Sequence, residues 1–200
     1  RPYKLCDVLC RMLVHDRDVQ SRLNVGTIDA DYGRLDEDQK RMLLRDIAYH
    51  MVDDIRRPGG STIRLDALDG ILREALAKFG QTVTDPAALR DVLIDRSGVL
   101  RKATNDHVDF IHNTLKEFLA AEKFITCGFA EKLTARADQR EWWPVILLAA
   151  GGNNQDFSDR LIRDILATAS KVPDKKKRPL HILAWACGFN AVAVSLDLRA

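Results

Sequence analysis

Residues 108–121, with the sequence VDFIHNTLKEFLAA, join the end of an apolar-alternating strand, one histidine and the start of a helix. Thr114 and Glu117 have the Thr-x-x-Glu spacing of a capping box, in which each side chain satisfies a free amide of the first helical turn. His112 comes just before this predicted start, where free amides and the helix dipole attract anions. The spacing alone favours a half-buried histidine in a strand-to-helix turn over a ligand-binding histidine.

The residues before this stretch predict a helix followed by a β-hairpin. Residues 99–103 and 107–111 flank the polar tip 104–106, a pattern typical of a hairpin. Asp85-Pro86 marks the start of the preceding helix, because Asp is a preferred N-cap and Pro fits the first helical position. That helix is expected to end near Ser97-Gly98.

Further upstream, the pattern predicts a helix over 36–56, a brief strand over 61–65 and a helix over 68–79 that Gly80 closes. The order helix, short strand, helix, helix and hairpin is the topology of a winged-helix domain. We place this domain at residues 36–127, including one extra helix behind the hairpin.

The two ends of the chain are expected to be helical. Residues 1–35 are interpreted as a leading helix and a polar connector, the connector covering residues 15–35. From Phe129 on, three amphipathic stripes follow one another: Trp142, Val145, Ile146 and Ala149; Ile162, Ile165, Leu166 and Ala169; Leu180, Leu183, Ala184 and Cys187. We therefore expect residues 128–200 to begin a HEAT-like α-solenoid, although no internal repeat supports this. The predicted fold class is mainly α, a winged-helix domain with a small hairpin wing followed by solenoid-like helices.

Composition limits the classes of function. The chain has 200 residues and a net charge of +2, so its overall balance calls for neither nucleic acid nor a membrane surface. No apolar stretch reaches the ~20 residues that a membrane-spanning helix needs. The four cysteines form no Cys-x-x-Cys pair, which favours a reduced, cytoplasmic setting. The start at Arg1, almost directly in a helical pattern, suggests a piece of a longer protein.

Motifs for self-contained catalysis are not found in the sequence. Gly59-Gly60 and Gly151-Gly152 are not followed by the Lys-Ser/Thr of a phosphate-binding P-loop. No His-x-x-x-His or His-Glu-x-x-His helix occurs to bind a catalytic metal. We therefore expect no catalytic residue and no metal ligand in this chain, and no enzymatic activity of its own.

Charge argues against DNA as the partner of the predicted winged helix. A recognition helix and wing that contact DNA usually carry excess Lys and Arg. Here Arg90 and Arg96 are balanced by Asp91 and Asp95 in the helix, and Arg101 and Lys102 by Asp106 and Asp109 in the wing. Nucleic acid is therefore not the expected partner, and this face is expected to pack on protein.

Residues 93–100 (LIDRSGVL), 108–112 (VDFIH) and 114–121 (TLKEFLAA) resemble the winged-helix segment of NACHT-type STAND NTPases. This family includes animal NOD-like receptors and bacterial NACHT defence proteins. Residues 141–151 (EWWPVILLAAG) also resemble the first helix after that domain in the bacterial members. Leu115 and Lys116 depart from the family pattern, which usually has Phe and Gln at these positions.

The resemblance implies a regulatory role. In NACHT proteins the winged-helix domain folds back on an upstream nucleotide-binding domain, and its histidine contacts the phosphates of ADP. Exchange for ATP, bound with Mg by that upstream domain, releases the winged helix and permits homo-oligomerisation. Carried over to this chain, His112 is the phosphate sensor, Phe110 and Phe118 are core anchors, and Thr114 with Glu117 forms the cap.

The resemblance reverses the interpretation of His112 and gives the leading hypothesis for function. The chain is expected to be the regulatory segment of a cytoplasmic STAND NTPase in bacterial antiviral defence or signalling. Two alternatives stay open: a winged-helix DNA-binding transcriptional regulator, and a helical protein-interaction scaffold. A P-loop in the sequence upstream of Arg1 would discriminate among the three.

Overall fold

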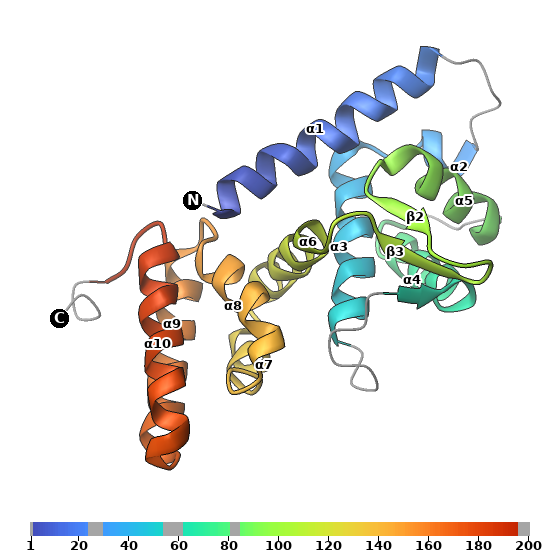
Figure 1. The fold of residues 1–200 in the computed structure, drawn as a ribbon. Helices are drawn as coiled ribbons and strands as arrows, with labels where there is room; N and C mark the ends of the chain where they lie inside the picture. The colour runs from blue at the N-terminus through green and yellow to red at the C-terminus, as the bar shows by residue number, and fades with distance from the viewer. Residues whose placement is uncertain (1, 24–29, 54–61, 81–84, 196–200) are drawn as a thin grey trace. The chain divides into compact units, whose positions relative to one another are not determined.

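The structure is a computed structural model that describes residues 2–23, 30–53, 62–80 and 85–195 (Figure 1). It is mainly helical with a small three-stranded antiparallel sheet, which confirms the predicted fold class at this level. The chain divides into two compact units: Asp7–Lys116, and Glu117–Ala200 together with Arg1–Cys6. The predicted domain boundaries after residues 35 and 127 fall inside these units.

The unit Asp7–Lys116 contains the sheet and the helices around it. After α1 (Pro2–Leu23), its elements are α2 (Ala30–Gly33), α3 (Glu37–Asp53), β1 (Thr62–Arg64), α4 (Leu65–Ala77), α5 (Pro86–Ser97), β2 (Leu100–Lys102) and β3 (His107–Phe110). The predicted order of helix, strand, helix, helix and hairpin is present. The strands lie in the order β1-β3-β2, so β3 is central.

The register of the hairpin separates an apolar face from a charged face. Leu100 pairs with Phe110, and Val108 lies opposite both Lys102 and Ile63. Leu100, Val108 and Phe110 are buried, because alternate residues of a strand point to the same side of the sheet. The core of this unit lies on that side, against the apolar faces of α3, α4 and α5.

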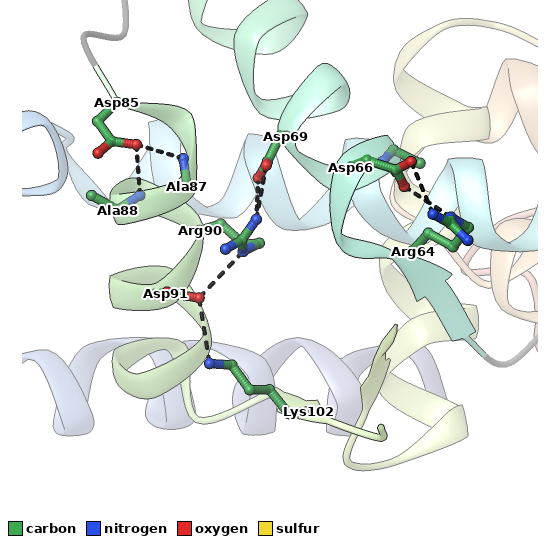
Figure 2. Close-up of polar contacts among 10 residues, drawn as sticks. Arg64, Asp66, Asp69, Asp85, Ala87, Ala88, Arg90, Asp91 and Lys102 are labelled. Atoms are coloured by element: carbon green, nitrogen blue, oxygen red, sulfur yellow. Dashed lines mark hydrogen bonds and ion pairs between the residues drawn. The ribbon is translucent and has the colours of Figure 1, made fainter. Parts of the chain in front are cut away.

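Local capping explains where α5 begins and ends. The Asp85 carboxylate accepts hydrogen bonds from the amides of Ala87 (3.0 Å) and Ala88 (3.1 Å), as Figure 2 shows. Pro86 occupies the first turn, as predicted. Gly98 ends the helix with φ of 66°, a left-handed conformation that favours glycine. This sharp end directs the chain straight into β2.

The predicted connector over residues 15–35 is wrong. Helix α1 continues to Leu23, and the short helix α2 also lies in this range, with Tyr32 and Leu35 buried nearby. Residues 14–23 are polar but contain neither Gly nor Pro. Polar side chains alone do not end a helix, whereas Gly and Pro destabilise its interior.

The described regular elements of the second unit are all helices, joined by turns and short irregular segments. It contains α6 (Asn113–Thr126) from Glu117 on, α7 (Ala130–Thr134), the 3₁₀ helix η1 (Arg140–Trp142), α8 (Trp143–Ala150), α9 (Gln155–Lys171) and α10 (Asp174–Asn190). The predicted stripes around Trp142 and Leu183 are buried. Leu166 was predicted to belong to the second stripe, but it is 37% exposed. None of the helices in the described residues combines the length and apolarity required to cross a membrane.

The basic run Lys175–Arg178 lies between Pro173 and Pro179, a composition that predicts a solvated loop, and this prediction is wrong. These residues form the first turns of α10, which continues through Pro179. The Pro173 carbonyl accepts hydrogen bonds from the amides of Lys176 (2.8 Å) and Lys177 (3.1 Å), which starts the helix ahead of the second proline. The run is solvent-facing, as expected, but it is helical.

The cysteines are free thiols: Cys6, Cys10 and Cys187 are buried, and Cys127 is exposed. Burial raises the pKa of the Cys187 thiol to about 12. Burial, and secondly the charge of Glu117, raises the pKa of Cys6. A raised pKa means less of the reactive thiolate at a given pH.

We predict that Cys127 is alkylated by iodoacetamide at pH 8 while Cys187 is protected. A thiol with a pKa of about 12 is only about one part in ten thousand thiolate at this pH. Mass spectrometry of tryptic peptides, before and after unfolding in urea, measures both sites. Comparable native rates at the two cysteines would contradict the burial of Cys187.

We also predict that Asp85→Ala lowers the free energy of unfolding by about 0.5–2 kcal/mol, because two amides of α5 lose their cap. Urea denaturation followed by circular dichroism measures this difference. Asp85→Asn is the matched control and is expected to keep most of the stability. Equal stability of the Ala variant and the parent protein would show that the cap contributes nothing.

Candidate functional site

His112 lies at the junction between β3 and α6, with an exposed side chain. Its carbonyl accepts hydrogen bonds from the amides of Leu115 (3.0 Å) and Lys116 (3.3 Å), and so begins the helix. The preceding amide, of Ile111, donates to the Val99 carbonyl at 2.8 Å, which ties the junction to the hairpin. The backbone of His112 is therefore held on both sides, and its imidazole faces solvent. The prediction of a half-buried histidine, which the spacing alone favoured, is therefore wrong.

The predicted capping box is also wrong. Helix α6 begins at Asn113, so Thr114 is its second residue and Glu117 its fifth. A capping box requires its Thr at the N-cap and its Glu at the third helical position. The hairpin bond of Ile111 leaves His112 as the single connecting residue, so the helix begins before Thr114 can act as its cap.

The two predicted phenylalanine anchors are buried, each within its own compact unit. Phe110 lies opposite Leu100 in the hairpin and is 5% exposed. Phe118 is fully buried, and its ring forms a T-shaped contact with the ring of Tyr3, with the centroids 5.1 Å apart. Leu115 and Lys116, where the chain departs from the family pattern, are also buried. Residues before and after His112 in the sequence are therefore buried by packing, whereas His112 itself is exposed.

The basic residue at the centre of α5 is held by carboxylates. Figure 2 shows the Arg90 guanidinium between Asp69 of α4 and Asp91 of α5. Its Nη1 donates to both Asp69 oxygens at 2.9 and 2.8 Å, and its Nε donates to Asp91 at 3.2 Å. The Arg90 side chain is only 11% exposed. This arginine therefore links two helices of the unit.

The basic residues of the hairpin are paired in the same way. The Arg101 guanidinium donates to both oxygens of Asp109 across the strands, at 2.8 and 3.0 Å. This pairing raises the pKa of Arg101 above its usual value. The Lys102 ammonium lies 3.5 Å from Asp91 (Figure 2). On the face formed by α5 and the hairpin, Arg90, Arg101 and Lys102 are thus each paired with a carboxylate.

A groove of about 840 Å³ lies on the same unit, between α3, β1 and α4. Its polar lining includes His50, Arg64 and His107. Arg64 donates to Asp66 at 3.1 and 3.3 Å, and His107 Nδ1 lies 2.9 Å from Asp106. This groove could not be predicted from the sequence, because its residues come from separate elements with no shared motif.

Metal-binding clusters are not found in the described ranges, where no three His, Cys, Asp or Glu side chains are placed to hold an ion. No protein-family model, no curated protein and no solved structure matches this chain. The candidate site is therefore defined by its own residues: the exposed His112 at the start of α6, beside a charge-neutral hairpin and helix.

We predict that Arg90→Ala lowers the free energy of unfolding by about 1–3 kcal/mol, because it leaves the largely buried Asp69 carboxylate without its main partner. Arg101→Ala is the matched control, since the Arg101 side chain is 60% exposed and its ion pair is screened by solvent, and it is expected to cost clearly less than Arg90→Ala. Urea denaturation of both variants measures the difference. Equal costs would mean that burial does not strengthen the Arg90 network.

Proposed function

We propose that this chain is the regulatory winged-helix region and the first C-terminal helices of a NACHT-type STAND NTPase. In this proposal, the winged-helix domain senses the ADP or ATP that an upstream domain of the same protein binds with Mg. The change of nucleotide then controls homo-oligomerisation in a cytoplasmic antiviral defence or signalling pathway.

The topology of residues 37–110 supports the winged-helix part of this proposal. Helix α3 is followed by β1, helices α4 and α5, and a hairpin whose second strand also pairs with β1. A winged helix has this order of elements and this small antiparallel sheet. The consecutive helices α7 to α10 support the start of a helical superstructure.

The exposure of His112 directly before α6 is the observation that carries the sensor role. The first amides of a helix have no intrahelical acceptor and attract anions. Asn113 and Thr114, the first two residues of α6, have exposed side chains as well. A phosphate placed here would contact the imidazole and meet free amides. These residues therefore fit a nucleotide phosphate presented by another domain.

The strength of such a contact suits a switch. A hydrogen bond to a charged group contributes about 1.5–3 kcal/mol, which corresponds to roughly 10-fold to 150-fold in affinity. This contribution is large enough to favour one nucleotide state and small enough to be reversed by exchange. Binding of the nucleotide itself would rest mainly on the upstream domain, and His112 would report its phosphates.

The paired cations favour this proposal over DNA binding. Phosphate contacts of Lys and Arg dominate DNA affinity. Arg90, Arg101 and Lys102 would have to leave Asp69, Asp109 and Asp91 before they could contact a DNA backbone. A steep salt-dependent affinity of this chain for duplex DNA would reverse this preference.

We predict that His112→Leu in the full-length protein weakens ADP retention by roughly tenfold or more and increases the oligomeric fraction. The reason is the loss of a polar contact made only in the ADP-bound, closed state. Isothermal titration with ADP and size-exclusion chromatography with light scattering measure the two effects.

His50→Leu is the control, because His50 is an exposed histidine on α3, away from the start of α6. It is expected to change neither ADP affinity nor assembly. If His112→Leu also leaves both unchanged, His112 is not the sensor.

A further inference from the structure

Exposed aromatic and aliphatic side chains gather on one face of α10. Trp185 is 72% exposed, Phe189 77% and Ile182 51%. The Trp185 and Phe189 rings stack on each other, with centroids 5.8 Å apart and planes at 17°. Exposed large apolar patches on soluble domains often mark interaction sites, whereas single exposed side chains do not.

This face borders an apolar groove between α9 and α10, which lie side by side in Figure 1. The groove has a volume of about 370 Å³. The groove is lined by Leu166 and by the stacked rings of Trp185 and Phe189. It is lined further by Ile162, His181, Ala184, Gly188 and Val194. Val194 is held at the groove by its neighbour Ser195, whose amide donates to Asp159 at 3.1 Å. The groove is therefore a formed feature of this unit.

Gly188 has no explanation in the packing of the described residues. It lies inside α10, where glycine costs about 1 kcal/mol relative to alanine. A Cβ atom added at this position would meet no atom within 4 Å. Glycine is used where another group must approach the backbone closely. Its place on the groove lining leaves room for a side chain from outside the unit.

The charges beside the apolar row indicate the chemistry of the occupant. Arg178 lies on the same helical face as Ile182, Trp185 and Phe189, because these residues follow the spacing i, i+4, i+7 and i+11. Lys175 and His181 flank it; Asp174 is the acid at the start of this helix, and Asp138 is paired with Lys176 at 3.2 Å. The exposed end of the row is therefore basic, and an acidic group on a partner would complement it.

We propose that the groove between α9 and α10 is a docking site for an amphipathic helix of another protein. The apolar face of this helix inserts a bulky side chain over Gly188, between Leu166 and the Trp185–Phe189 pair. Its flanks carry Asp or Glu that face Arg178 and Lys175. This inference does not depend on the nucleotide-sensor role of His112.

A second copy of this chain is a less complementary occupant. Helix α1 also has exposed apolar residues, with Leu5 62% and Val8 53% exposed. The exposed cation beside them, Lys4, would meet the basic end of the groove, whereas Arg11 is paired with Asp7 at 3.2 Å. Like charges brought together in this way oppose association.

The test uses the full chain and a fluorescein-labelled 20-residue helical peptide with leucines at i, i+3, i+4 and i+7 and glutamates on both flanks. A second peptide has lysines in place of the glutamates. Fluorescence anisotropy is expected to show roughly tenfold tighter binding of the glutamate peptide. Arg178→Glu is expected to remove this preference or reverse it, because it exchanges the sign of the groove's basic end.

Three further variants test the groove itself. Gly188→Leu is expected to weaken peptide binding at least roughly tenfold while Tm stays equal or rises, because leucine favours the helix and fills the groove. Gly70→Leu is the matched control, since Gly70 is also a helical glycine with open space around it, on α4. It is expected to leave binding unchanged. If Gly188→Leu fails to fold, Trp185→Ala carries the same test, with a loss of roughly tenfold or more.

Several outcomes would overturn the proposal. Neither peptide binding to the full chain, or both binding equally to every variant, would remove the docking site or its charge preference. A dimer in sedimentation that Gly188→Leu dissociates would make a second copy the occupant. Binding to vesicles of phosphatidylcholine and phosphatidylserine that depends on Trp185, without peptide binding, would assign the face to a membrane surface.

Discussion

The hydrogen bond from the Ile111 amide to the Val99 carbonyl is the constraint on which the candidate site depends. It closes the hairpin at the residue before His112, and the carbonyl of His112 then accepts the first amides of α6. His112 alone lies between the last hydrogen bond of the hairpin, made by Ile111, and the first residue of α6, Asn113. The position of the histidine is therefore fixed by two backbone interactions, and its side chain is not required for the fold. The exposed imidazole is therefore accessible to a group outside its own unit.

The charges of the same unit serve its internal structure. Arg90 is largely buried and joins α4 to α5 through Asp69, whereas Arg101 and Asp109 pair across the exposed side of the hairpin. Buried ion pairs add little stability relative to apolar packing, but removing one partner is costly because a buried charge remains. Arg90 and Arg101 thus form ion pairs within the unit. The charges of these two arginines on α5 and the hairpin are balanced as a result. A neutral surface is better suited to packing on protein than to binding a phosphate backbone.

Sequence reasoning succeeded where one residue decides the local conformation. Asp85, Pro86 and Gly98 act through a cap, a fixed φ and a left-handed turn, and the helix bounds at these residues were predictable. It failed where composition was used in place of such signals. The polar residues 14–23 continue α1, and Lys175–Arg178 begin α10, because neither segment contains a residue that must end a helix there. Thr114 shows a third kind of error: its spacing to Glu117 matches the motif, but α6 begins at Asn113, so Thr114 is the second helical residue and cannot be the N-cap.

What the sequence could not supply is the pairing of surfaces from separate elements. The pairing of β1 with β3, the bond between Arg90 and Asp69, and the groove between α9 and α10 all join residues that share no local motif. Leu166 illustrates the consequence, since its spacing matches its buried neighbours on α9 but it borders the groove and stays partly exposed. The presence of Gly188 is explained only by its position on the lining of this groove. A glycine inside a helix lowers the stability of that helix. At position 188 it also leaves an open part of the surface beside the stacked rings of Trp185 and Phe189.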